Sequence, residues 1–197
     1  MKLSTQWKSL NRDQRRAWSA WAKDNAVLLD DGSFRRVSAH KAMTLILRNR
    51  SVAGDSLRPA SSPAAATWLD GVLGLSDCGP MTAGGGFIGF RASAAIAAET
   101  KWFLWATAPI LTTDSAPLLS LTFISVMNCP ALEETDLTPN LGPNYLPVHG
   151  TWKPGYAETE SHSGWHPPRV IWLRLHQYHD GQLSPGRLFR GAIYYAN

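Results

Sequence analysis

Four histidines near the end of the chain have the residue type and spacing from which metal sites are built. His162 and His166 are four residues apart, which would align them on a helix, but the Pro-Pro pair that follows directly stops a helix there. His176 and His179 are three residues apart, so a strand would place them on opposite faces. We therefore expect no metal site and no cofactor.

Other patterns with catalytic potential lack the context that their chemistry needs. Gly84, Gly86 and Gly89 match the dinucleotide pattern G-x-G-x-x-G, but a β-like run follows them where the pattern requires a helix. Acidic residues gather in segments 133–136 and 158–160, yet sugar hydrolysis needs two carboxylates held at a set separation across a cleft. The sequence contains no nucleophile elbow, P-loop or H-E-x-x-H motif. We predict that the protein is not an enzyme.

The composition favours a protein that contacts other macromolecules. Charged residues make up 17% of the 197 residues, and nine residues are tryptophan; an average soluble domain has about 25% charged residues. A chain with little charge and many aromatic rings tends to bury surface against a partner. No apolar run approaches the roughly 20 residues of a membrane span, and no signal-peptide core is visible. We expect a protein made in a cytoplasm, with no membrane contact.

The charge is divided unevenly along the chain. Residues 1–58 hold 12 Lys/Arg and 5 Asp/Glu, a net charge of +7, whereas the remainder holds 7 and 10, a net charge of −3. Such a division marks a boundary between two bodies. We predict a basic helical arm at 1–58, a Pro-rich linker at 59–83 and a β-rich domain at 84–197.

The first body is predicted to be helical. Asn11 and Gln14 form a capping-box pattern at the start of a helix on which Trp18 and Trp21 share one stripe with alanines. A second helix begins after Ser38. Its apolar stripe has five members: Ala39, Ala42, Met43, Ile46 and Leu47. Two short helices give a small core, so we expect them to pack on something more.

The second body is predicted to be built of strands. Five short apolar runs are bounded by Gly, Pro, Asp and Ser, and Asp180-Gly181 is a hairpin turn signal between the last two. The runs occupy residues 86–97, 101–109, 118–126, 169–178 and 187–195. This spacing predicts an antiparallel β-sandwich of the fibronectin-III or immunoglobulin type. The expected fold class is therefore α+β overall, mainly β.

Alternation within the run 169–178 predicts two different faces. One face is apolar and is expected to be core: Ile171, Leu173 and Leu175. The other face is amphipathic and is expected to dock on a partner: Trp172, Arg174, His176 and Tyr178.

The N-terminal residues carry a resemblance. The pattern W-x-x-L-x-x-x-Q-R-x-A-W-x-x-W-A resembles the HMG-box-like opening of many uncharacterised proteins of bacteriophages and prophages. It is formed here by Trp7, Leu10, Gln14, Arg15, Ala17, Trp18, Trp21 and Ala22. WATAPILTTDSAP and RVIWLRLHQYHDGQLSP resemble strand and hairpin segments of the fibronectin-III-like sandwich that often follows. The resemblance implies a virion-associated protein, such as a capsid-decorating, connector or tail component.

The expected function is thus that of a non-enzymatic structural protein whose partners are copies of itself or other virion subunits. Trp7, Trp18 and Trp21 would anchor the helical arm in a neighbour. An alternative is a DNA-binding accessory protein. Its candidate contacts are Arg12, Arg15, Arg16, Lys23, Arg35 and Arg36. A third possibility is a carbohydrate-binding module that uses Trp152, Trp165 or Trp172 as a stacking platform.

Overall fold

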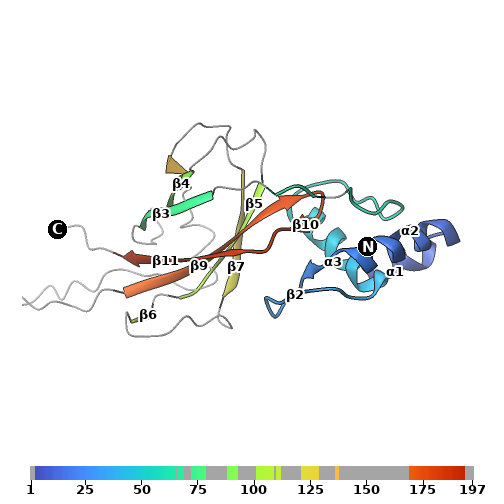
Figure 1. Cartoon of the computed structure of the whole chain (residues 1–197), viewed down its shortest axis with the longest axis horizontal. Coiled ribbons are helices and arrows are strands. Elements are labelled where there is room, and N and C mark those ends of the chain that lie inside the picture. Colours follow the sequence, from blue (N-terminus) through green and yellow to red (C-terminus); the bar gives the residue numbers. More distant parts are fainter. Residues whose placement is uncertain are drawn as a thin grey trace, which may run out of the picture. The chain divides into compact units, whose positions relative to one another are not determined.

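The chain folds into a few helices and many strands. A computed structural model describes residues 3–64, 66–68, 72–78, 88–92, 101–108, 110–111, 121–128, 136–137 and 169–193. The fold is of the α+β class and rich in antiparallel strands, as the sequence predicts (Figure 1). The chain divides into two compact units: a helical unit, Met1–Trp68 with His176–Gly186, and a sheet unit, Leu69–Leu175 with Arg187–Asn197.

The N-terminal part of the helical unit contains one element more than the two expected helices and also a small hairpin. Its elements are α1 (Leu3–Ser9), α2 (Arg12–Asp24), β1 (Val27–Leu28), β2 (Phe34–Arg35) and α3 (Ala39–Val52). Helix α1 was not expected from the sequence. Helix α3 contacts both α1 and α2.

The predicted helix starts are confirmed. The side chain of Asn11 accepts the backbone N–H of Gln14 at 2.9 Å, and the Gln14 side chain accepts the backbone N–H of Asn11 at 2.9 Å. This reciprocal pair satisfies two amides that the first turn of α2 leaves without intrahelical acceptors. Ser38 caps α3 with a single hydrogen bond, in which its side-chain oxygen accepts the backbone N–H of Lys41.

The chain between α2 and α3 forms a hairpin. The amide of Gly32 donates to the carbonyl of Leu29, which closes the turn between β1 and β2. Asp31 accepts both the amide and the hydroxyl of Ser33, at 2.9 and 2.5 Å. These two hydrogen bonds hold the pKa of the Asp31 carboxyl below its usual value, because they favour its charged form.

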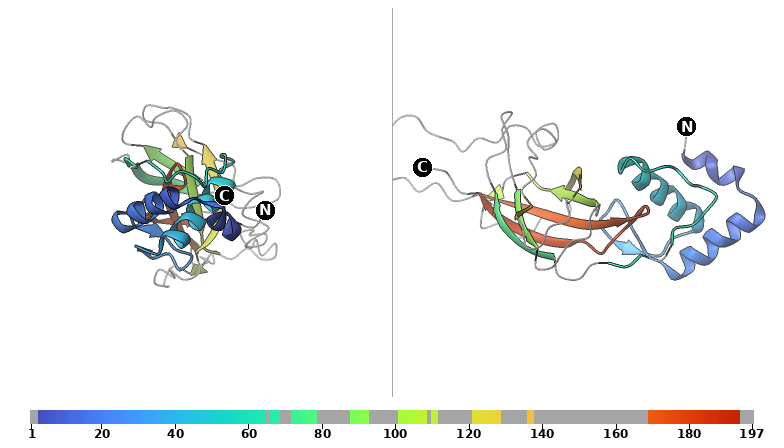
Figure 2. Two further views of the ribbon diagram at one scale, coloured as in Figure 1. Left: turned by 90° about the vertical axis from the view of Figure 1, so that its right-hand side faces the viewer. Right: turned by 90° about the horizontal axis from the view of Figure 1, so that it is seen from above.

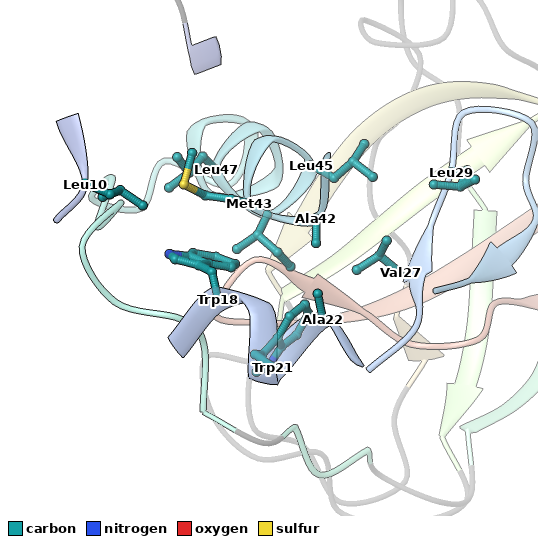
Figure 3. Packing of buried hydrophobic residues seen from close by; sticks show 11 residues of the cluster. Leu10, Trp18, Trp21, Ala22, Val27, Leu29, Ala42, Met43, Leu45 and Leu47 are labelled. Carbon is teal, nitrogen blue, oxygen red and sulfur yellow. The ribbon is translucent and has the colours of Figure 1, made fainter. Parts of the chain in front are cut away.

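The core of the helical unit lies between α2, α3 and the hairpin β1–β2. Figure 3 shows Trp18 and Trp21 reaching from α2 toward the apolar side chains of α3. The buried cluster contains Leu10, Trp18, Trp21, Ala22, Val27, Leu29, Ala42, Met43, Leu45, Ile46 and Leu47. Both predicted stripes are therefore core, except that Ala17 is exposed and Ala39 is only partly buried.

The helical unit is completed by a segment from far along the sequence. Strands β9 (Arg169–His179) and β10 (Gln182–Leu183) form a hairpin whose end, residues 176–186, we call the hairpin tip. His179 pairs with Gln182 across a two-residue turn in which Asp180 and Gly181 have φ values of 48° and 88°. The predicted Asp-Gly turn is confirmed, since turns of this kind require positive φ at both positions.

The hairpin tip covers a second face of α3. Besides its predicted apolar stripe, α3 buries Leu45, Asn49 and Arg50. Gly181 packs so closely on α3 that an added Cβ would lie 2.6 Å from Ile46 Cγ2 and 3.1 Å from Arg50 Cγ. The sequence predicts that the two helices pack on a further element. That element is the hairpin tip near the C-terminal end of the same chain.

The expected boundaries of the linker differ from the structure at both ends. The Pro59 carbonyl accepts the indole N–H of Trp18 at 2.8 Å, and Pro63 is buried. The start of the expected linker is therefore packed within the helical unit. Near its end, Val72–Cys78 forms strand β3.

The described residues of the sheet unit form two antiparallel sheets. The first has the order β3 (Val72–Cys78), β4 (Ile88–Ala92), β8 (Asp136–Leu137). In the second, β5 (Lys101–Ala106) lies between β9 and β7 (Thr122–Asn128), while β6 (Ile110–Leu111) and β11 (Arg187–Ile193) also pair with β9. Figure 2 shows β9 and β11 as a long antiparallel pair. Trp102, Phe103 and Leu104 are all buried, so β5 is covered on both faces.

We predict that Gly181→Ala destabilises the helical unit by about 3 kcal/mol, because it combines an unfavourable backbone conformation with a steric overlap. The added methyl would also lie 2.7 Å from the backbone oxygen of Ile46. Urea unfolding followed by tryptophan fluorescence measures the loss.

Gly54→Ala is the matched control. Gly54 follows the C-cap of α3 and has a φ of 74°, but an added Cβ would meet nothing within 4 Å. This variant carries only the backbone cost, about 1 kcal/mol. Equal losses for the two variants would contradict the close packing of the hairpin tip on α3.

Candidate functional site

The two central tryptophans of α2 are used inside the protein. Trp18 has no exposed surface, and Trp21 is 9% exposed. Their ring centroids are 5.9 Å apart in an edge-to-face arrangement with an interplanar angle of 74°. A ring without exposed surface cannot contact a second chain, so the burial of Trp18 does not fit the expectation that it anchors an arm in a neighbour. Trp21 keeps only a small exposed surface for that role.

Trp7 is placed differently from the other two expected anchors. It packs against the core from α1 but is only partly buried. Its ring lies 5.6 Å from the ring of His40, centroid to centroid. Of the three tryptophans expected to anchor the helical arm, Trp7 is thus the most accessible.

His176 and Tyr178 also lie inside, although alternation placed them on an outer face with Trp172 and Arg174. His176 is 1% exposed, and its Nδ1 is 2.7 Å from the carbonyl oxygen of Ser184. Tyr178 is buried and donates its hydroxyl to the carboxylate of Asp55. The alternation of buried and exposed side chains stops at Leu175, because in the helical unit both faces of the strand are covered.

A buried ion pair joins the hairpin tip to α3. The Arg50 side chain is 1% exposed, and its Nη2 lies 2.8 Å from Oδ1 of Asp180. Arg50 Nε and Nη1 donate to the carbonyls of Asp180 and Arg58 at 3.3 and 3.2 Å. The neighbouring Asn49 donates to the carbonyl of Gly181 at 2.9 Å. A buried guanidinium is tolerated only when its charge and its N–H groups are matched in this way.

Further polar contacts fasten the hairpin tip to the segment that follows α3. Gln182 Nε2 donates to the carbonyl of Ala64 at 2.7 Å. The Tyr178–Asp55 hydrogen bond spans 123 residues of sequence. Burial, and then the hydrogen bond and charge of Asp55, raise the pKa of Tyr178 well above the ordinary value for a tyrosine.

The remaining half of the predicted outer face is accessible. Trp172 and Arg174 are partly exposed, whereas Ile171, Leu173 and Leu175 are buried, as predicted. Across the ladder, Trp172 faces Arg190 and Arg174 faces Leu188, and directly opposed residues share one side of a sheet. We call the set Trp172, Arg174, Leu188 and Arg190 the outer face of β9–β11. Leu188 is 37% exposed, and the buried Nε1 of Trp172 has no hydrogen-bond partner within the described residues.

The basic residues of the helical unit fall into two groups. Four arginines pair with aspartates: Arg16 with Asp13, Arg35 with Asp31, Arg48 with Asp30 and Arg50 with Asp180. A second group of exposed cations forms no salt bridge in the part of the chain that the structure describes: Lys8, Arg12, Arg15, Lys23, Arg36, Lys41 and Arg58. The six expected nucleic-acid contacts are all exposed, and four of them belong to this unpaired group.

The described residues contain no group of three His, Cys, Asp or Glu side chains placed to hold a metal. His176 is buried and His179 is exposed. A strand, β4, follows the glycine-rich segment, so the dinucleotide pattern lacks its helix. The other residues considered for chemistry or sugar stacking lie outside the described residues: His162, His166, Glu133, Glu134, Glu158, Glu160, Trp152 and Trp165.

Comparisons with known proteins add no further information on function. No protein-family model matches the chain, and no similar curated protein or solved structure was found. Among the described helices, none combines the length and the apolar character required to span a bilayer.

We predict that Asp180→Asn destabilises the helical unit by about 2 kcal/mol, because it leaves the Arg50 guanidinium buried without its counter-ion. Asparagine also tolerates positive φ and is favoured before glycine in this turn, so the change removes the charge and keeps the backbone. Urea unfolding measures the difference. Asp30→Asn removes the partner of the exposed Arg48 and should cost less than about 1 kcal/mol.

We also predict that Tyr178→Phe lowers the free energy of unfolding by about 1–2 kcal/mol at neutral pH, since it removes a buried hydrogen bond. The advantage of the native tyrosine is complete below about pH 10, the ordinary tyrosine pKa. It falls as the pH rises further, because the unfolded chain then releases the Tyr178 proton while the folded chain keeps it. Urea unfolding of both proteins from about pH 8 to about pH 11, a range that brackets the ordinary tyrosine pKa, shows whether the stability difference decreases as the pH rises. A constant difference over this range would contradict the assignment.

Proposed function

We propose that the chain is a non-enzymatic structural protein of a phage-like particle or another assembly, and that it contacts neighbouring subunits through the outer face of β9–β11. The observation that carries this proposal is the combination of Trp172, Arg174 and Leu188 on one side of a long strand pair. Tryptophan and arginine are the residues most enriched at the energetic centres of protein interfaces. An apolar side chain that is 37% exposed between arginines adds surface that a partner can cover.

The tryptophans that are only partly buried support the same function. Seven of the nine lie within the described residues, and four of these are only partly buried: Trp7, Trp68, Trp105 and Trp172. A partly buried indole presents apolar area and a polar N–H together, which suits a contact surface. The resemblance of the N-terminal pattern to phage and prophage proteins favours a virion as the location.

The sheet unit is, in this proposal, an antiparallel sandwich of the fibronectin-III or immunoglobulin type. Two antiparallel sheets are present among the described residues. Phe103 of β5, a strand of the larger sheet, is only 2% exposed. A strand that is covered on both faces fits a sheet that packs against a second layer.

The helical unit is then a folded body with its own core and not a flexible docking arm. Its tryptophans Trp18 and Trp21 stabilise its own core, and the hairpin tip closes it. Subunit contacts therefore do not depend on α2 inserting its aromatic stripe into a neighbour. They depend on surfaces that remain accessible after each unit has folded.

The double variant Trp172→Ser, Leu188→Ser tests the proposal. We expect the purified full-length native protein to form oligomers that grow with concentration, and we expect the variant to be at least 10-fold weaker in self-association. Analytical ultracentrifugation measures the self-association of both proteins. The 10-fold loss is expected because removing two interface anchors costs at least about 1.4 kcal/mol, which corresponds to this factor.

Val52→Ser, Leu57→Ser is the matched control, since these two apolar residues are 45% and 40% exposed and belong to the helical unit, whereas Trp172 and Leu188 belong to the sheet unit. It should associate like the native protein. A native protein that stays monomeric at high concentration, or a control as weak as the test variant, would overturn the assignment of this face.

A further inference from the structure

The helical unit has a hollow lined by basic residues, which lies outside the proposed subunit contact on β9–β11. It is open to solvent, has a volume of about 620 Å³ and lies between α2 and the residues that lead into α3. Its lining consists of Ser19, Ala22, Lys23, Arg36, Val37, Ser38 and Ala39. Both charged residues of this lining are cations.

No acidic residue lines this hollow. Arg35, the immediate neighbour of Arg36, pairs with Asp31 at 3.2 Å. Lys23 and Arg36 are exposed and have no acidic partner among the described residues. Two like charges that line one concave surface produce a positive potential, which an anion relieves when it binds there.

Neutral donors accompany the two cations. Ser38 uses its side-chain oxygen to accept the amide of Lys41, so its hydroxyl hydrogen is available to an acceptor in the hollow. Ala39, the first residue of the 14-residue helix α3, also lines the hollow. The first-turn amides of a helix reinforce anion binding that side chains have already begun.

The positive surface extends beyond the hollow along α2. Arg12, Arg15, Ser19 and Lys23 follow one another at three- and four-residue steps, which places them along one side of the helix. The distance from Arg12 to Lys23 along the axis is about 16 Å, at 1.5 Å per residue. A row of this length exceeds a single phosphate ion and suits a chain of phosphates.

We propose that the hollow and the row on α2 bind the phosphate backbone of a nucleic acid, with Lys23 and Arg36 as the principal contacts. The helical unit carries the charge for such a ligand, because residues 1–58 have 12 Lys/Arg against 5 Asp/Glu. No base-reading role is assigned to these residues. Binding is electrostatic, and its affinity falls steeply with salt concentration.

Fluorescence anisotropy of the full-length protein with a labelled DNA duplex, and with an RNA duplex of the same length, tests the proposal over a series of salt concentrations. Lys23→Gln, Arg36→Gln should lower the affinity at least 10-fold at low salt. The slope of log affinity against log salt should fall by about 2, since roughly 0.9 of a counter-ion is released for each phosphate contact.

Arg35→Gln, Arg48→Gln is the matched control. It removes the same charge from exposed positions, but these two arginines are paired with Asp31 and Asp30. We expect its affinity to stay within about 3-fold of the native value, since pairing already screens these charges. An equal loss in the control would show that net charge alone drives binding and would overturn the assignment of the hollow.

Absence of binding to either duplex at low salt would also overturn the proposal. Complete displacement of the duplex by millimolar inorganic phosphate would overturn it as well. The outcome is independent of the proposed assembly, because Trp172→Ser, Leu188→Ser should bind the duplex like the native protein once it is compared at equal oligomeric state.

Discussion

The arrangement of the helical unit depends on a guanidinium group that has almost no contact with water. The Arg50 side chain is 1% exposed, and a charge in such a position is strongly destabilising unless a counter-ion and hydrogen-bond acceptors surround it. Asp180 and the carbonyls of Asp180 and Arg58 supply them. Because Asp180 lies 130 residues further along the sequence, the N-terminal segment alone cannot satisfy its own interior.

The features that the sequence predicts correctly are those governed by neighbouring residues. The capping box at Asn11, the cap at Ser38 and the Asp180-Gly181 turn each follow from short-range hydrogen bonds or backbone preferences. Burial of Arg50 and Tyr178 was not predictable in the same way. Polar side chains ordinarily face solvent, and their partners here come from distant segments.

The candidate surfaces show the same limit. The stripe shared by Trp18 and Trp21 is correctly predicted as apolar, but periodicity says nothing about whether the chain itself or a partner covers it. Net charge likewise predicts a basic body without saying which cations are neutralised. Only the structure separates Arg35, which pairs with Asp31, from Arg36, which does not pair with an acid among the described residues.

The discontinuity of the helical unit has a consequence for how the protein is made. Synthesis proceeds from the N-terminus, so α1, α2 and α3 leave the ribosome long before residues 176–186 exist. During that interval the face of α3 that holds Asn49 and Arg50 remains hydrated, and the nascent chain waits in an incomplete state. Contacts separated by more than 100 residues, such as Asn49 to Gly181, also form slowly because a large loop must close first. Folding of the helical unit is therefore completed only after residues 176–186 have been synthesised.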